Sequence, residues 1–367
     1  MVFVDVSNVV QTVDGIVVHY EYRNLIFRKP AGTSRGVLLE KPTWFMHIRA
    51  AEKKGIGECS VIPGLSIDYT DRSSYEQDLQ VLKKILIQCN IEEFTFDKLS
   101  IQFPEEVKDF LFNKPSIQFG LEMALRSIFA DKQNCFFLND FFFGKEKIPI
   151  NGLVWMDSVQ EMYKQFELKF QQGFRTMKFK IGALSFKEEI DLIEKIRSQY
   201  DHSILEIRVD ANGAFSLKEV RNKLGVLSNY QLHSIEQPIP PENRTLLKEL
   251  SLERIVPIAL DEELIGIHRM KDKEELLSNV CPQYIVLKPS LHGGINGTLE
   301  WIEVAQKNNI QWWITSALES SLGLEAIAQF TYSLNEPKVH GLGMGNIYKN
   351  NIDSVLKVEN GFLFRSL

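Results

Sequence analysis

The amino-acid sequence predicts an α/β protein in which a (β/α)8-type barrel, residues 131–345, carries an N-terminal α+β domain, residues 1–130. Two observations support this prediction. From about Ile148 onward, eight short apolar runs alternate with amphipathic stretches, which is the pattern of repeated β/α units around a parallel sheet. Charged side chains stand at the ends of five of these runs, spaced by about one unit each. A closed barrel fits better than an open doubly wound sheet, because no glycine-rich dinucleotide fingerprint follows the first run.

The first third of the chain mixes strand and helix patterns. Residues 16–22 and 45–51 combine β-branched and aromatic side chains as strands do, and residues 53–55 predict a turn after the second of them. Within residues 115–132 the apolar side chains keep to one helical face. The tail, residues 346–367, shows no further β/α unit, and we expect it to complete the N-terminal domain.

The barrel strands are predicted from short apolar runs, and the helices between them from apolar residues three or four positions apart, as in residues 187–197 and 217–227. The eighth run is the weakest of the set. The predicted strands are residues 148–155, 176–181, 205–209, 233–235, 256–260, 284–287, 310–315 and 338–342.

Composition excludes several classes of protein. Among 367 residues, 42 basic side chains stand against 48 acidic ones, and 44% of residues are hydrophobic, as in globular domains and unlike disordered or collagen-like chains. The basic residues are scattered, so we expect no nucleic-acid partner. The four cysteines have no Cys-x-x-Cys spacing, which argues against a zinc ribbon or a disulfide framework. Because the N-terminus lacks a signal-peptide pattern and no apolar run reaches membrane-spanning length, we expect a cytoplasmic protein with no membrane partner.

The ends of strands two to six carry the residues that point to chemistry. In a β/α barrel the carboxyl ends of all strands lie on one rim, where barrel enzymes have their active sites. A charge at the end of an apolar strand is costly unless it is paired or bound to a cation. The residues are Lys178 and Lys180 on strand two, Asp210 on strand three, Glu236 on strand four, Asp261 on strand five and Lys288 on strand six.

Three carboxylates without histidine or cysteine form a hard oxygen site, which suits Mg²⁺. Lys178 and Lys180 are two residues apart and therefore point to the same face of their strand, while Lys288 arrives from across the site. A lysine close to a divalent cation and to another lysine is expected to have a lowered pKa and to act as a base. This set indicates proton abstraction next to a carboxylate, with the enolate stabilised by Mg²⁺.

Each motif also has an ordinary structural explanation. A Lys-x-Lys pair is usually solvated surface, residues 210–212 resemble a turn or helix cap, and residues 261–262 could open a helix. Lys288 before Pro289 could be a strand-end charge. Together, at the register of a barrel, these explanations would require five coincidences, so the sequence favours one site.

In this order, the strand-end residues resemble those of the enolase superfamily and, within it, of the muconate-lactonizing-like branch. Members have an enolase-like modified TIM barrel with an N-terminal capping domain, so the resemblance implies this fold. It covers nearly the whole chain. Its supporting segments are residues 57–59, 63–66, 178–182, 287–290 and 315–324.

The resemblance implies that Asp210, Glu236 and Asp261 bind Mg²⁺, with Mn²⁺ as a possible substitute. Lys180 and Lys288 would be the catalytic residues for a small carboxylate substrate. Lys180 would abstract the α-proton of a succinyl-substituted hydroxycyclohexadiene carboxylate and return a proton to the departing hydroxyl. Lys288 would stay cationic and stabilise the enolate over the ring face. Elimination of water then forms an aromatic ring.

The same resemblance gives supporting roles to further residues at the rim. Lys178 would contact a carboxylate oxygen of the substrate, and Asn212 and Glu262 would orient the residues that contact metal and substrate.

The resemblance also suggests contacts with the rest of the substrate. Leu65, in the loop lent by the capping domain, would cover the ring. The backbone N–H of Ser316 would receive the succinyl carboxylate, and Gly341 or Gly343 near strand eight would do likewise. Ordinary loop packing is the alternative at each of these positions.

Several other functions are alternatives to this one. N-succinylamino acid racemases and dipeptide epimerases share the carboxylates and lysines. Epimerases tend to hold the substrate ammonium with an Asp-x-Asp pair after strand eight, whereas residues 340–345 here contain no acid. A Schiff-base aldolase using Lys288 would leave the three carboxylates unexplained. A non-catalytic binding protein would be expected to lack at least one of the charged groups. The sequence leaves the oligomeric state open.

Overall fold

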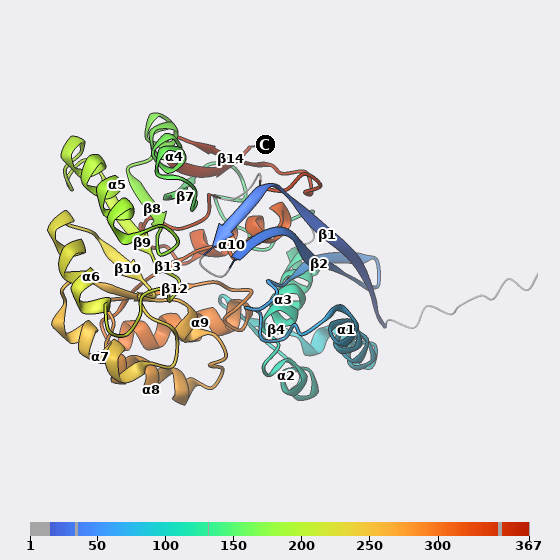
Figure 1. Cartoon of the computed structure of the whole chain (residues 1–367). Coiled ribbons are helices and arrows are strands. Elements are labelled where there is room, and N and C mark those ends of the chain that lie inside the picture. Colours follow the sequence, from blue (N-terminus) through green and yellow to red (C-terminus); the bar gives the residue numbers. More distant parts are fainter. Residues whose placement is uncertain (1–14, 34–35, 131, 344–346, 367) are drawn as a thin grey trace, which may run out of the picture.

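The computed structural model describes residues 15–33, 36–130, 132–343 and 347–366. Its N-terminal elements, blue to teal in Figure 1, lie beside the β/α units that run from green to orange. The predicted class is confirmed, since an N-terminal antiparallel domain accompanies a curled parallel sheet with helices outside it. Of the helices in these ranges, none is long and apolar enough to cross a membrane.

The N-terminal domain, called the capping domain below, packs helices on one face of a three-stranded antiparallel sheet of order β1-β2-β3. Helix α3 approaches strand β3 so closely that a Cβ atom on Gly57 would lie 1.8 Å from the carbonyl oxygen of Gly120. Glycine at both contact points permits this approach. The elements are β1 (Ile16–Thr33), β2 (Gly36–Ala50), β3 (Lys53–Ser60), α1 (Arg72–Leu86), η1 (Ile91–Glu93), β4 (Thr95–Asp97), β5 (Ser100–Gln102), α2 (Glu105–Leu111) and α3 (Pro115–Ala130).

One local prediction in this domain is wrong. The turn expected at residues 53–55 begins two positions earlier, at residues 51–52, and strand β3 has already begun at Lys53. Ala51 adopts a left-handed backbone with φ of 49° and makes the turn there without a glycine.

The barrel sheet has seven parallel strands in sequential order from β7 to β13, and helices cover its outer face. Its core is one continuous cluster of buried apolar side chains contributed by strands and helices alike. The strands are β7 (Gly152–Val154), β8 (Thr176–Lys180), β9 (Glu206–Asp210), β10 (Ser234–Glu236), β11 (Ile258–Leu260), β12 (Tyr284–Leu287) and β13 (Gln311–Ile314). The helices are α4 (Val159–Gln171), α5 (Phe186–Gln199), α6 (Val220–Leu227), η2 (Ser228–Tyr230), α7 (Arg244–Glu253), η3 (Glu262–Leu264), α8 (Met270–Val280), α9 (Gly294–Lys307) and α10 (Ser321–Ser333).

The eighth predicted strand, residues 338–342, forms only single-residue bridges. His340 bridges to Ile150 on one side, and Gly341 bridges to Thr315 on the other, so this segment closes the ring between β7 and β13. A Cβ atom on Gly341 would lie 2.4 Å from Oγ1 of Thr315, so the backbones meet where a larger residue would clash. The apolar pattern of residues 338–342 reflects burial, since His340 and Leu342 are buried, and this burial does not require a continuous strand pairing.

The C-terminal tail contacts both parts of the molecule. The backbone of Ile347 accepts a hydrogen bond from Arg28 of β1 at 2.8 Å. Further along, β14 (Leu356–Glu359) and β15 (Phe362–Arg365) form an antiparallel sheet with β6 (Lys147–Pro149) at the start of the barrel. The predicted domain boundaries stay a prediction, and their residues 1–14, 131, 344–346 and 367 lie outside the described ranges.

Candidate active site

The register of the barrel sheet places the predicted charged residues at one level. Lys180 at the end of β8 is the lateral neighbour of Asp210 at the end of β9, and Asp210 is the neighbour of Glu236 at the end of β10. Asp261 directly follows β11, and Lys288 directly follows β12. Each of these strands ends in a charge or is followed directly by one, so the fold gathers these side chains on one rim.

At this rim the three lysines face the three carboxylates. Nζ of Lys178 lies 2.8 Å from Oδ2 of Asp210 and 2.5 Å from Oε2 of Glu236. Nζ of Lys180 lies 2.6 Å from the same Asp210 oxygen. The remaining ion pair joins Nζ of Lys288 to Oδ2 of Asp261. The carboxylates are almost completely buried, so these pairs act at low local dielectric, where charge interactions are strong.

Burial and neighbouring charges shift the pKa values of these groups. Burial alone would lower the pKa of Lys178, but Asp210 and Glu236 outweigh it and raise the pKa above its ordinary value. The pKa of Lys288 is raised against burial by Asp261 in the same way. The lowered lysine pKa expected from the sequence concerns a base beside a bound divalent cation, so it stays a prediction. That expectation assumed a cation to neutralise the carboxylates, whereas here the carboxylates act directly on the ammonium groups.

The pKa values of the three carboxylates shift in different directions. Burial would raise the pKa of Asp261, but the ammonium of Lys288 outweighs it and lowers the pKa to about 2. The pKa of Asp210 is lowered, because Lys178 and Lys180 overcome its burial. Burial and the negative charge of Asp210 raise the pKa of Glu236 well above its ordinary value. Glu236 is thus the carboxylate of the set that most lacks a cation.

The donor set fits a hard divalent cation. Oε1 of Glu236 and Oδ1 of Asp261 are buried without a hydrogen-bond partner in the described part of the chain, and a buried acceptor of this kind is costly unless it binds something. Within the described ranges, no three histidine, cysteine or carboxylate side chains are positioned to hold a metal ion together. The carboxylates of the site are instead paired with the lysine ammonium groups. Carboxylate oxygens alone suit Mg²⁺.

Two polar residues support Lys180 as the sequence suggested. Oδ1 of Asn212 accepts a hydrogen bond from Nζ of Lys180 at 2.8 Å, and Nδ2 of Asn212 donates to Oε1 of Glu262 at 3.0 Å. This chain of hydrogen bonds fixes the position of the Lys180 ammonium. Lys178, Asn212 and Glu262 are thereby brought together with the five residues at the strand ends.

Two further supporting residues escaped the sequence analysis. Oε1 of the buried Gln237 accepts hydrogen bonds from the backbone of Asp261 and Glu263, which orients the turn that carries Asp261. His292 lies in the loop between β12 and α9; it is buried, and its Nδ1 accepts a hydrogen bond from the backbone N–H of Lys288 at 3.0 Å. Side chains that bind backbone atoms leave no periodic signal, although Gln237 directly follows Glu236 in sequence.

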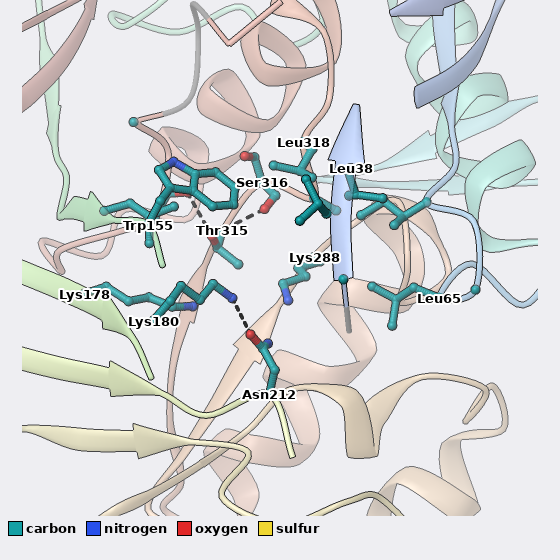
Figure 2. Close-up of a pocket in the computed structure, with 18 of the residues that line it drawn as sticks. Leu38, Leu65, Trp155, Lys178, Lys180, Asn212, Lys288, Thr315, Ser316 and Leu318 are labelled. Atoms are coloured by element: carbon teal, nitrogen blue, oxygen red, sulfur yellow. Dashed lines mark hydrogen bonds between the residues drawn. The ribbon is translucent and has the colours of Figure 1, made fainter. Parts of the chain in front are cut away.

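A cavity of about 460 Å³ opens above the lysines. Figure 2 shows Lys178 and Lys180 entering it from one side and Lys288 from the other, with Trp155 and Leu318 among the residues around them. No acidic side chain lines the cavity in the part of the chain that the structure describes. Its lining residues are Gly36, Val37, Leu38, Ile62, Pro63, Gly64, Leu65, Asn151, Leu153, Trp155, Lys178, Lys180, Asn212, Lys288, Thr315, Ser316, Ala317, Leu318, Gly341 and Gly343.

The residues predicted to contact substrate line this cavity, but one expected donor is wrong. Leu65, Ser316, Gly341 and Gly343 are all in the lining. The backbone N–H of Ser316, expected to receive a carboxylate, instead donates to the carbonyl oxygen of Gly341 at 3.1 Å, since this bond closes the barrel. The hydroxyl Oγ of Ser316 is buried and has no hydrogen-bond partner among the described residues.

Sequence analysis missed two other lining residues. Oδ1 of the buried Asn151 also has no hydrogen-bond partner within the described ranges. Trp155 presents its ring to the cavity beside the lysines. Both belong to the run 148–155, where alternate residues of a first barrel strand point inward, so period-two alternation could have found them.

Comparison with known proteins agrees with this geometry. Residues 161–365 match the family described as enolase C-terminal domain-like. The chain is 40% identical over 365 residues to o-succinylbenzoate synthase of Desulfotalea psychrophila, covering 95% of this chain and 99% of that protein.

Solved structures give the same result. The crystal structure of MenC from Desulfotalea psychrophila LSv54 superposes with a TM-score of 0.81 at 36% identity, covering 95% of this chain and 99% of that one. A dipeptide epimerase from Enterococcus faecalis V583, complexed with Mg and the dipeptide L-Leu-L-Tyr, has a TM-score of 0.78 at 18% identity, over 96% and 97% of the two chains. The second match shows the shared fold. The chain belongs to the enolase superfamily and, within it, to the o-succinylbenzoate synthase family.

Proposed function

We propose that this protein catalyses the Mg²⁺-dependent dehydration of 2-succinyl-6-hydroxy-2,4-cyclohexadiene-1-carboxylate to 2-succinylbenzoate. This is the reaction of an o-succinylbenzoate synthase, which is a hydro-lyase. The observation that carries the proposal is the pair Lys180 and Lys288 on opposite sides of one cavity, above three buried carboxylates. The identity of 40% over almost the whole of a protein with that name supports the choice of substrate.

The roles proposed for the charged residues follow from their contacts. Asp210, Glu236 and Asp261 would hold Mg²⁺, with Mn²⁺ as a substitute, and Mg²⁺ when bound would supply positive charge that stabilises an enolate. A dipeptide epimerase of the same fold has been solved in complex with Mg. Glu236, whose pKa is raised by burial and by Asp210, would be kept ionised by such a charge.

The proton transfer is assigned to Lys180. In its neutral form, Nζ would accept the proton from the carbon next to the ring carboxylate. The ring C–O bond to the 6-hydroxyl then breaks, and the same Nζ returns a proton so that water leaves. Asn212 and Glu262 hold Nζ in place for both transfers. The product gains an aromatic ring, which provides a strong thermodynamic pull.

Lys288 and Lys178 would act as fixed positive charges. Lys288 would stay cationic, as a group that stabilises an enolate across the ring must be. Lys178 would contact a carboxylate oxygen of the substrate. Three lysines and no acid in the described lining suit an anionic substrate.

The remaining contacts concern the substrate's ring and succinyl chain. Leu65 and Trp155 would cover the ring, since both present apolar surface to the cavity. The succinyl carboxylate would bind at Oγ of Ser316 near Gly341, where a buried hydroxyl has no partner in the described part of the chain. A cytoplasmic location and a step in menaquinone biosynthesis belong to the same proposal.

One alternative has an observation in its favour. Lysines on opposite faces of a cavity could each deliver or remove a proton, as racemisation of an N-succinylamino acid requires. A dipeptide epimerase is less well supported, because the described lining holds no carboxylate to receive a substrate ammonium.

The test is a spectrophotometric assay of the purified protein with the cyclohexadiene substrate, with Mg²⁺ or with excess chelator. We expect rapid formation of the aromatic product with Mg²⁺ and its loss with chelator. No conversion by a folded, Mg²⁺-binding protein contradicts the proposal. In that case, exchange of the α-hydrogen of an N-succinylamino acid in D₂O would support the racemase.

A further inference from the structure

A buried polar cluster behind the cavity takes no part in the proposed chemistry. It consists of Lys41 on β2, Glu58 on β3 and Glu319 between β13 and α10, each at most 2% exposed. It lies where the capping domain meets the barrel, because Glu58 from the first contacts Ser320 from the second. Buried charges are costly, and such a cluster is expected to have a specific task when it lies beside a site.

Glu319 ties together two loops of the barrel rim. Its Oε1 accepts a hydrogen bond from the hydroxyl of Ser290 at 2.5 Å, and its Oε2 accepts from the backbone N–H of Ala317 at 2.7 Å. Ser290 lies two residues after Lys288, and Ala317 lines the cavity. One carboxylate therefore holds the loop after β12 and the loop after β13 at a fixed separation.

The segment that Glu319 holds has a strained shape. Leu318 adopts a left-handed backbone with φ of 63°, which is unfavourable for a leucine unless its surroundings enforce it. The carbonyl of Leu318 accepts a hydrogen bond from the hydroxyl of Tyr348 at 2.6 Å, so the turn is held from both ends. This conformation places Ser316, Ala317 and Leu318 side by side in the cavity wall.

The capping domain contributes a buried cation to the cluster. Nζ of Lys41 donates hydrogen bonds to Thr43 and Ser60 of its own domain. Burial raises the pKa of Glu319, and the hydrogen bond from Ser290 and the positive charge of Lys41 oppose that rise. Glu58 in turn accepts from the backbone of Ser320 and of Gly323 at 2.9 Å each, at the first turn of α10. Through these contacts of Glu58, docking of the capping domain is coupled to the turn formed by residues 315–318.

We propose that Glu319 is a positioning residue for the substrate pocket: its buried carboxylate holds the 315–318 turn in the shape that contacts the substrate, with Lys41 of the capping domain as its counter-charge. This inference rests on the proposed function for the identity of the substrate. It does not depend on that function for the effect of Glu319 on the turn.

The test compares Glu319→Gln with a matched control, Glu325→Gln. Glu325 is also buried and lies on α10, but it pairs with Arg365 and is absent from the cavity lining. We expect Glu319→Gln to raise KM for the cyclohexadiene substrate about tenfold, with kcat within about threefold. The amide has only one acceptor oxygen, so if that oxygen keeps the N–H of Ala317 the bond with the Ser290 hydroxyl must reverse, and the negative charge is lost. The control is expected to leave KM unchanged, although it lowers thermal stability.

A second measurement needs no substrate. Amide hydrogen exchange in the ligand-free protein, followed in a peptide that spans residues 315–320, is expected to be about tenfold faster in Glu319→Gln than in the wild type or the control. If the variant fails to fold, Ser290→Ala removes one of the two bonds to Glu319 and is expected to give the same changes at smaller size. Lys41→Met, at a residue outside the lining, is expected to raise KM as well.

The outcomes separate the two proposals. A wild-type protein that does not convert the substrate removes the proposed function, while the exchange measurement still decides the role of Glu319. Unchanged exchange in residues 315–320 and an unchanged KM in Glu319→Gln, with only a loss of stability like that of the control, overturn the positioning role.

Discussion

On the barrel side of the cavity three lysines pair with the carboxylates beneath them, whereas the described residues of the capping side offer apolar side chains and no charge. Lys180 and its neighbours stand at strand ends, where the backbone register sets their spacing. Leu38 and Leu65 belong to a hairpin and a loop of the capping domain and meet the barrel only across the cavity. This difference indicates that the barrel sheet carries the reactive groups and that the capping domain recognises the shape of the substrate.

This division predicts different kinetic signatures. Changes at the rim remove interactions that the proposed reaction needs in its transition state, so they lower kcat. Changes on the capping side remove contacts made equally by bound substrate and transition state, so they raise KM. The predictions below test this contrast, beginning with the largest expected effect.

Replacement of Lys180 is expected to have the greatest effect. Lys180→Ala should lower kcat by about 10³-fold or more, because it removes the proposed proton acceptor. The assay follows formation of the aromatic product at saturating substrate. Lys187→Ala, at an exposed lysine on α5, serves as the control and should match the wild type. Substantial activity in a folded, Mg²⁺-binding Lys180→Ala protein would show that another group is the base.

Asp210→Asn tests the proposed metal site. The variant should lose its response to Mg²⁺, because one of three proposed ligands is gone. It should also be less stable without metal by about 3–5 kcal/mol, since Lys178 and Lys180 both lose their buried partner. Calorimetric titration with Mg²⁺ and urea unfolding measure the two effects. Asp191→Asn, which removes an exposed partner of Lys187, should change stability by less than about 1 kcal/mol. An unchanged Mg²⁺ dependence in Asp210→Asn contradicts the assignment.

The same contrast explains what the sequence could predict. The barrel and its rim follow from local rules: apolar runs alternate with amphipathic stretches, and each run ends in a charge one unit after the previous one. The register then brings Lys180, Asp210 and Glu236 to neighbouring positions without further information.

Long-range contacts limited the rest of the prediction. Leu38 is apolar like many surface residues of a strand, and only the docking of two domains places it at the cavity. The backbone N–H of Ser316 was misassigned because its partner, Gly341, lies in a strand too short to predict well. Glu319 has its partners on a loop nearly 30 residues away and on a different domain. No spacing rule reveals such contacts.

The interface between the two regions is expected to respond to pH. Glu122 on α3 of the capping domain accepts hydrogen bonds from Gln118 and from the backbone of Ile295 and Asn296 at the start of α9 of the barrel. Burial raises its pKa from 4.5 to about 7. Between these values the folded protein binds more protons than the unfolded chain, so this group's contribution to stability is present below pH 4.5 and is lost as the pH rises through 7.

Glu122→Gln isolates this effect, since it keeps the shape and removes the titration. The stability of the wild type relative to the variant should fall by about 3 kcal/mol between pH 4.5 and pH 8. Urea unfolding of both proteins at several pH values gives the difference, in which contributions of other groups cancel. A difference that stays constant with pH would mean that Glu122 does not titrate in this range.

The smallest change in kinetics is expected from the residues that the capping domain contributes to the cavity. Leu65→Ala removes apolar surface that would cover the substrate ring, and loss of a few buried carbon atoms costs about 1–1.5 kcal/mol. We therefore expect KM to rise about five- to tenfold, while kcat stays within about twofold. Ile67→Ala is the matched control, because Ile67 lies two residues away, is exposed and is absent from the cavity lining. If Leu65→Ala instead lowers kcat and leaves KM unchanged, the capping domain takes part in the transition state, and the division between reactive barrel and recognising cap does not hold.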